Sequence, residues 1–168
     1  MIDLIVGNLF SLLAAVCDAV SASRKSAKSV LLVQTLSQAF YGLTGIALKG
    51  YSAAVQNAVS ILRNLAALKK IESKWVERVL VSLGVILGVA FNNRGFIGLL
   101  PVLANLGYSI AVFRFKDNEV ALKAAFFVSV FLFCIFNAAI LNLVGTVSNV
   151  ILFVVTGIFL IKAIKLRK

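Results

Sequence analysis

The chain has 168 residues, of which 61% are apolar and only 14% are charged, and its mean hydropathy is +1.04. A soluble domain is typically about 45–50% apolar and about 25% charged, so this chain could not cover itself with polar surface in water. Its net charge of +11 would suggest nucleic acid as the partner of a soluble protein. Because the cations form short runs between apolar stretches, the pattern instead predicts a membrane protein whose partner is the lipid bilayer, with no nucleic acid.

Seven apolar stretches are candidates for transmembrane helices, each of which needs roughly 20 residues, and the fourth of them is short. They predict an all-α, polytopic protein, and the short connections between them make successive helices antiparallel neighbours. The first stretch carries Asp3 instead of a basic segment and lacks a clear cleavage site, so we expect a permanent helix rather than a signal peptide. The expected transmembrane helices span residues 2–20, 29–48, 51–68, 79–91, 96–113, 120–141 and 145–164.

The basic residues predict the orientation of the chain. With seven spans, every Lys and Arg except Lys49, Arg94 and Arg63 falls on one side of the membrane. Lys and Arg resist translocation, so this side is expected to face the cytoplasm, with the N-terminus outside and the C-terminus inside. The residues on the expected cytoplasmic side are Arg24, Lys25, Lys28, Lys69, Lys70, Lys74, Arg78, Arg114, Lys116, Lys123, Lys162, Lys165, Arg167 and Lys168.

The seven stretches group as three, one and three. Residues 1–70 would form a first three-helix bundle, and residues 96–168 would form a second one. Residues 71–95 between them would form a cytoplasmic linker, which contains KKIESKWVER from Lys69 onward, and a linking helix.

The two expected bundles align with each other in sequence. LFSLLAAVCDAVSASR lies against LLPVLANLGYSIAVFR with a shift of 90 residues, which pairs Arg24 with Arg114. A two-residue insertion then pairs Asn57 with Asn149. An odd number of helices separates equivalent positions, so both bundles would run in the same direction through the membrane. The alignment predicts a parallel repeat about an axis along the membrane normal.

Polar side chains recur at helical spacing along the first three expected helices, and in hydrocarbon they should turn away from lipid. One interpretation is that they make contacts between helices, which are worth about 0.6 kcal/mol each. The long amides Gln34, Gln38 and Gln56 favour a second interpretation, a polar cavity, because each amide needs several hydrogen-bond partners. Tyr41 shares a helix face with Gln34 and Gln38 and would line the same cavity.

Asp18 and Arg63 each lie six residues before a basic cluster, in helices expected to run toward the cytoplasm. At about 1.5 Å per residue, both would lie roughly 9 Å above that cluster, at one depth. A lone charge at mid-membrane costs about 2.5–3.5 kcal/mol, so we expect an ion pair between them that acts as a gate or as a fixed strut. The alternative is that Arg63 extends to the inner headgroups.

The residues that usually carry chemistry are scarce. The chain has no histidine, and its two cysteines, Cys17 and Cys134, lie within apolar stretches. This composition argues against a His/Cys metal cluster, a His-based triad and a disulfide framework. Asp18 is the only acid well inside an expected span, so general acid–base catalysis has few candidates. We therefore expect neither an enzyme nor a bound cofactor.

Three segments resemble a known family. The stretch SVLLVQTLSQAFYGLTGIALKGYSAAVQNAVSILRN, the segment GLLPVLANLGYSIAVFRF, and Asn137 with GTVSN, in this order, are similar to the YgjV family of bacterial inner membrane proteins. The resemblance covers nearly the whole chain. It implies a multi-pass protein of the bacterial inner membrane.

The layout of three, one and three helices also resembles, more distantly, the SWEET and PnuC transporters and the PQ-loop proteins related to them. In SWEET-like proteins an asparagine on the third helix of each bundle faces the substrate, which the resemblance implies for Asn57 and Asn149. Those proteins also carry prolines in the first two helices of each bundle. Here only Pro101 matches such a proline, and Ser11 stands at the corresponding place in the first half.

These features together predict a facilitator or transporter for a small polar solute, with a central site between the two bundles. The alternative is a non-transporting scaffold or accessory subunit whose polar faces pack against a partner. Whether the chain forms a homo-oligomer stays open at this point. The residues expected to bind the solute or line its pathway are Asn57, Asn149, Gln34, Gln38, Tyr41 and Gln56.

Overall fold

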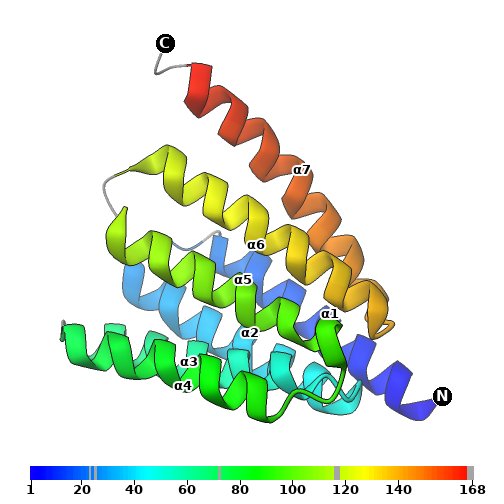
Figure 1. Cartoon of the computed structure of the whole chain (residues 1–168). Helices are drawn as coiled ribbons and strands as arrows, with labels where there is room; N and C mark the ends of the chain where they lie inside the picture. Colours follow the sequence, from blue (N-terminus) through cyan, green and yellow to red (C-terminus); the bar gives the residue numbers. More distant parts are fainter. Residues whose placement is uncertain (23, 25, 72, 116–117, 166–168) are drawn as a thin grey trace.

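The computed structural model describes every residue except 23, 25, 72, 116–117 and 166–168. The prediction of an all-helical chain is confirmed for this part, which forms seven helices (Figure 1). Lys25, Lys116, Arg167 and Lys168, which the sequence assigns to the basic side, lie outside the described residues. The helices are α1 (Ile2–Ala22), α2 (Ala27–Ala47), α3 (Tyr51–Leu68), α4 (Lys74–Ala90), α5 (Gly95–Arg114), α6 (Glu119–Ala139) and α7 (Leu143–Lys165).

Helix α4 differs most from its expected bounds, because it begins at Lys74 and not at residue 79. The sequence predicts a linker for the charged segment KKIESKWVER, but its second half, from Lys74 to Arg78, is the start of the helix. Ser73 precedes the helix in an extended conformation, and Glu77 lies in its first turn. The Glu77 carboxylate interacts favourably with the helix dipole, whereas Lys74 and Arg78 at the same end do not.

Four helices are long and apolar enough to cross a membrane, judged by length and composition. They are α1, α2, α6 and α7, whose apolar segments have 20, 20, 20 and 23 residues. Helix α5 contains a shorter apolar stretch, Gly95–Ala111. Helices α3 and α4 have 18 and 17 residues, and α3 buries Ser52, Gln56, Ser60 and Asn64. Such a helix suits a bilayer only with its polar face turned toward protein.

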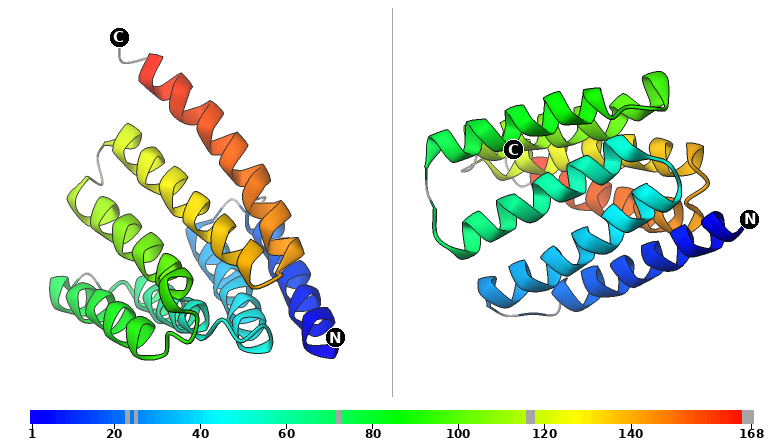
Figure 2. Two further views of the ribbon diagram at one scale, coloured as in Figure 1. Left: turned by 45° about the vertical axis from the view of Figure 1, so that its right-hand side comes forward. Right: turned by 90° about the horizontal axis from the view of Figure 1, so that it is seen from below.

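The helices form a ring in chain order, with α4 outside it. Helix α2 packs between α1 and α3, and α6 packs between α5 and α7. The ring closes through contacts of α3 with α5 and of α1 with α7, while α4 contacts only α3 and α5 (Figure 2). Because successive helices are antiparallel, the two ends of the chain lie at opposite ends of the bundle (Figure 1).

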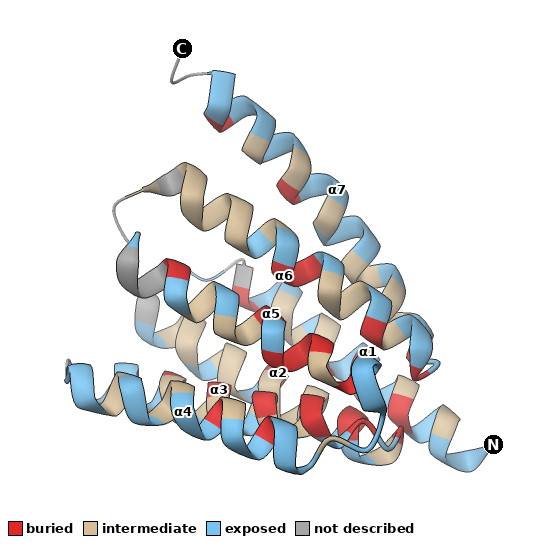
Figure 3. Ribbon diagram, viewed as in Figure 1, coloured by how far each residue is buried: buried red, intermediate tan, exposed pale blue. Residues whose placement is uncertain are grey.

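Polar side chains are buried and large apolar ones are exposed, which reverses the pattern of a soluble protein. Ser11, Ser37 and Ser52 are at most 1% exposed, whereas Leu9 and Ile151 are 55% and 59% exposed. Buried residues, red in Figure 3, gather toward the end where α2 meets α3 and α6 meets α7. An outer surface of this kind is stable only in contact with lipid, because in water it would expose far more apolar area than a soluble protein does.

The two halves of the ring share several of their helix bounds at one offset. Helix α6 begins and ends 92 residues after α2, and α7 begins 92 residues after α3. The caps obey the same offset: the side chain of Ser26 accepts a hydrogen bond from the Ser29 amide, and that of Asn118 accepts one from the Ala121 amide. Capping by Ser or Asn satisfies a helix-end amide that would otherwise lack a partner.

The α2–α3 and α6–α7 connections, here called the hairpin tips, are also alike. Lys49 and Leu141 both adopt the left-handed backbone conformation, with φ of 55° and 60°. In each tip, the backbone amide of the next residue donates to a carbonyl in the last turn of the preceding helix. Gly50 donates to the Gly45 carbonyl at 2.7 Å, and Asn142 donates to the Asn137 carbonyl at 2.9 Å. This arrangement is common at helix ends, usually with glycine at the left-handed position. Neither Lys49 nor Leu141 is glycine, so each tip carries backbone strain of about 1–2 kcal/mol.

Each hairpin tip is bound by the opposite half of the ring. The Asn8 side chain on α1 donates to the Leu141 carbonyl at 3.1 Å and accepts from the Val144 amide at 3.1 Å. At the other tip, the Lys49 carbonyl accepts from the side chains of Asn93 at 2.8 Å and Arg94 at 3.1 Å. Arg94 also donates to the Leu48 carbonyl at 2.8 Å. We call these two sets of bonds the clasps.

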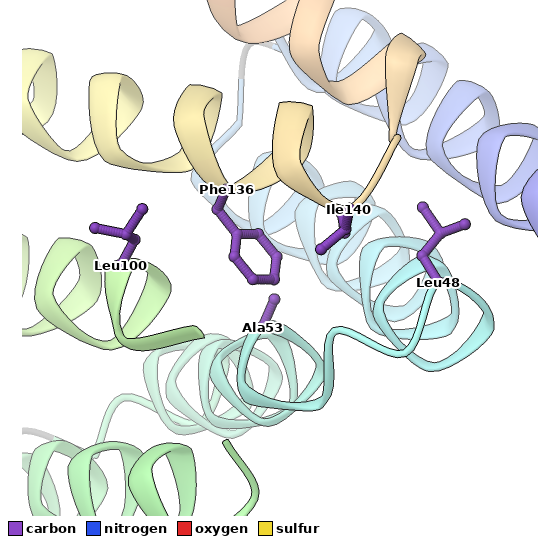
Figure 4. Close-up of a cluster of buried hydrophobic side chains, with 5 residues drawn as sticks. All are labelled: Leu48, Ala53, Leu100, Phe136 and Ile140. Carbon is purple, nitrogen blue, oxygen red and sulfur yellow. The ribbon is translucent and has the colours of Figure 1, made fainter. Parts of the chain in front are cut away.

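An apolar cluster lies beneath the clasps. It contains side chains from α3, α5 and α6 and the residue that ends α2 (Figure 4). Phe136 fills its centre at 1% exposure. The hydrogen-bonded tips and this cluster together close one end of the ring. The cluster residues are Leu48, Ala53, Leu100, Phe136 and Ile140.

Helix α4 is held against the ring by Gln56. The Gln56 side chain donates to the Gly84 carbonyl of α4 at 2.7 Å and accepts from the Asn105 side chain of α5 at 3.0 Å. Gly84 and Gly88, one helical turn apart, leave room for it. A Cβ atom at Gly88 would meet the Gln56 amide and would lie 2.7 Å from a methyl group of Val102.

We predict that Gly88→Ala destabilises the protein, because the added methyl group displaces the buried Gln56 amide from its partners. Overpacking of this kind costs about 1–3 kcal/mol. The matched control is Gly107→Ala on α5, where a Cβ atom would meet nothing within 4 Å. Ala is favoured over Gly inside a helix, so the control should be neutral or slightly stabilising. Thermal unfolding in detergent compares the two; equal midpoints would contradict the packing described for α4.

A second prediction concerns the clasp on α1. Asn8→Ala removes one donor and one acceptor, and each bond contributes about 0.5–1.5 kcal/mol, so a loss of about 1–3 kcal/mol is expected. Asn8→Asp keeps the acceptor for the Val144 amide but sets a second oxygen against the Leu4 and Leu141 carbonyls, so it should lose at least as much. Leu9→Ala, at an exposed neighbour, is the control. Unfolding in mixed micelles measures all three, and an Asn8→Ala variant as stable as the wild type would show that the clasp does not hold the tip.

Candidate functional site

A cavity of about 660 Å³ lies inside the ring. Side chains from all the ring helices line it, and none of the described lining residues comes from α4. The volume falls within the range of about 300–1,000 Å³ that small-molecule sites usually have. The cavity extends from Ile140 and Asn142, beside the closed end, to Arg24, which is exposed at the other end. The ring therefore encloses a space that begins at the apolar cluster. The space reaches the surface at the end of the bundle that carries Arg24, here called the basic end.

Polar amides from both halves of the ring face this cavity. Gln34 and Gln38 of α2, Asn57 of α3 and Asn149 of α7 all line it. Gln34, Gln38 and Asn149 form no hydrogen bond with any described residue. The Asn57 amide donates to the Ala53 carbonyl of its own helix at 2.9 Å, which leaves its side-chain oxygen unbound among the described residues. Amides without protein partners retain their full capacity to bind water or a polar solute.

Tyr41, the fifth cavity-lining residue expected from the sequence, contacts the carboxylate of Asp18. Its hydroxyl donates to Asp18 Oδ2 at 3.1 Å. Both residues line the cavity. The bond links α1 to α2, which pack closely along their length. A hydrogen bond to a carboxylate is stronger than one between neutral groups, so it fixes the Tyr41 side chain at the cavity wall.

The expected ion pair between Asp18 and Arg63 does not form in this structure, although both residues line the cavity. The reason lies in the order of the helices. Helix α2 separates α1 from α3, and it supplies Tyr41 as the nearer partner of Asp18. Both charges line the central cavity, but equal depth alone does not make two residues neighbours.

Gln56 does not line the central cavity among its described walls, although the sequence places it there. It is 3% exposed and is bound on both sides, by Gly84 and Asn105. It lies at a second cavity of about 300 Å³ between α3, α4 and α5. The glycines at positions 84 and 88 are the signal that could have predicted this, because two glycines one turn apart allow a bulky polar group to approach the helix.

Three polar residues border both cavities, namely Ser60, Arg63 and Asn105. Asn105 and Tyr108 of α5, Ser129 of α6 and Asn137 also face the central cavity, and the sequence assigned no site role to them. The aromatic side chains of Phe126, Phe133 and Phe136 also line the central cavity. No sequence pattern could have identified those aromatic residues, since phenylalanine is equally suited to contact with lipid.

Among the described residues, no group of three or more His, Cys, Asp or Glu lies close enough to hold a metal ion.

Comparison with known proteins identifies the chain at the level of a family. A family model described as a bacterial inner membrane protein, Imp-YgjV, matches residues 5–167. No curated protein and no solved structure matches the chain. The match spans nearly the full length and agrees with the several apolar helices of the structure. The chain therefore belongs to the YgjV family of bacterial inner membrane proteins.

Proposed function

We propose that this protein is a facilitator or transporter for a small polar solute of the bacterial inner membrane. The observation that carries the proposal is the central cavity, where Gln34 and Gln38 from one half of the ring and Asn149 from the other have no hydrogen-bond partner among the described residues. A scaffold whose polar faces only packed together would satisfy these amides within the protein, because an unpaired buried polar group costs about 1–3 kcal/mol. An open, amide-lined space is what solute binding needs.

The proposal includes an architecture of seven spans arranged as a parallel repeat of three helices, a linking helix α4, and three helices. The offset of 92 residues that several helix bounds share supports it. The ring contacts support it as well, because exchanging the halves turns the contact of α3 with α5 into that of α7 with α1. Both hairpin tips, Lys49 and Leu141, are bound by the opposite half. A cavity on the axis of such a repeat is the usual place for a transport site.

Asn57 and Asn149 are the proposed solute ligands, since the repeat relates them to each other and both face the cavity. Gln34, Gln38 and Tyr41 would contribute further hydrogen bonds. In the described structure the clasps and the apolar cluster close one end of the cavity. Arg24 lies exposed at the other end, where the cavity is open. If the basic end faces the cytoplasm, as the distribution of Lys and Arg favours, the structure represents a form open to the inside.

No energy source for active transport is evident among the described cavity residues. Asp18 is the only acidic side chain among the described residues that line the central cavity, and Tyr41 binds it. Proton coupling needs a carboxylate or histidine that can exchange protons during the cycle. Passive or exchange transport is therefore the mode that the site supports best.

Solute flux in liposomes tests the proposal. Purified protein would be assayed for uptake of a panel of sugars, amino acids, organic acids and nucleosides, beside protein-free liposomes. Asn149→Leu should lower uptake of a transported solute by about tenfold or more, the equivalent of one lost hydrogen bond to a polar ligand. Val150→Leu, on the exposed side of α7, should leave it unchanged. Absence of flux for the entire panel, with the protein correctly folded, would overturn the proposal and favour a scaffold.

A further inference from the structure

We propose that the central cavity selects a small organic anion, a carboxylate or phosphate ester, and that Arg63 is its counter-ion. The inference rests on the proposed function and names the substrate class of the same site. It begins from the position of Arg63, which borders the central cavity and also the smaller cavity beside α4. The guanidinium group is therefore available from the interior of the ring, and lipid is not its only surrounding.

The acidic side chains that the structure describes leave Arg63 without an ion pair. They are Asp3, Asp18 and Glu77. Asp3 is exposed in the first turn of α1, and Asp18 is bound by Tyr41. Glu77 borders the smaller cavity but forms no ion pair with Arg63. A half-buried cation without a carboxylate partner carries a desolvation cost that an incoming anion would offset.

The groups around Arg63 suit an anion that carries further polar atoms. Ser60 and Tyr108 line the same cavity, and their hydroxyl groups have no hydrogen-bond partner among the described residues. Both hydroxyls can donate to an anionic oxygen, and a guanidinium group can bind carboxylate or phosphate through two parallel hydrogen bonds. The amides of Gln34 and Gln38 complete a lining that would bind the hydroxyl or carbonyl groups of the same molecule.

The charge at the open end favours the same class of solute. Arg24 is exposed where the cavity reaches the surface, and Lys28, Lys69 and Lys70 are exposed at the same end of the bundle. A basic entrance raises the local concentration of anions and repels cations. Arg24 and Arg63 outnumber Asp18 among the described charged residues of the cavity, so its lining is net positive.

A phospholipid headgroup is the other source of the same chemistry. Arg63 lies six residues before Lys69, which corresponds to about 9 Å along the helix, so a headgroup phosphate could approach it from the basic end. A free anion and a lipid phosphate differ in one measurable respect. Only the free anion is transported, and its binding does not depend on the charge of the surrounding lipid.

The test compares uptake of succinate and glycerol 3-phosphate with uptake of uncharged glycerol and ribose, in liposomes of phosphatidylcholine. Arg63→Gln should reduce uptake of at least one anion by about 10- to 100-fold, the loss expected for a charged hydrogen bond, without lowering uptake of a neutral solute. A thermal unfolding midpoint in detergent equal to that of the wild type shows that the variant is folded. Arg63→Lys keeps the charge but not the bidentate geometry and should fall between. Glu77→Gln, on the smaller cavity, is the control.

The outcomes separate the two proposals. If neutral solutes are transported and neither anion is, or if Arg63→Gln lowers both classes equally, the anion inference fails and the proposed function stands. If no solute moves, the proposed function itself fails. A second measurement covers the lipid: native mass spectrometry in detergent, with phosphatidylglycerol or glycerol 3-phosphate added. Arg63-dependent retention of the lipid that glycerol 3-phosphate does not displace would assign Arg63 to headgroups and overturn the inference.

Discussion

The requirement that polar groups lie away from lipid governs this structure. Hydrocarbon offers no hydrogen bonds, so each helix satisfies its own backbone and turns its polar side chains toward the ring. Small hydroxyl residues such as Ser37 and Thr44 do this by bonding to carbonyls of the neighbouring α1. Amides such as Gln34 and Asn149 make no such bond among the described residues, and they border an open space. The central cavity lies where these amides face the interior of the ring.

The same requirement explains why the two ends of the ring differ. At the hairpin tips the left-handed residues Lys49 and Leu141 leave carbonyls that need donors, and Arg94 and Asn8 from the opposite halves supply them. These bonds hold the halves together over the apolar cluster. The basic end has long charged side chains, such as Arg24, that water solvates. Opening the clasped end, as the proposed function requires, would break these hydrogen bonds, worth about 0.5–1.5 kcal/mol each, and would separate the apolar cluster.

The sequence predicted the helices well, because the length of an apolar stretch reflects the thickness of the bilayer. It paired Asn57 with Asn149 by alignment, and both residues line the central cavity. It did not predict the start of α4, since charged residues in a first helical turn resemble a linker. The sequence did not predict the hydrogen-bond partners of Asp18 and Gln56, for a different reason. Helical periodicity identifies the face on which a side chain lies, but the order of helices around the ring decides which neighbour that face meets.

The most direct test of this account is the accessibility of adjacent positions on α7 to a charged, membrane-impermeant thiol reagent. In a variant with Cys17 and Cys134 replaced by serine, single cysteines would be placed at Asn149, which lines the cavity, and at Ile151, which is 59% exposed on the outer surface. The account predicts that Asn149→Cys reacts in inverted membrane vesicles and is protected in intact cells, whereas Ile151→Cys is protected in both. Labelling of Ile151→Cys with a silent Asn149→Cys would contradict the account, because the outer face of the ring would then be wet and its interior dry.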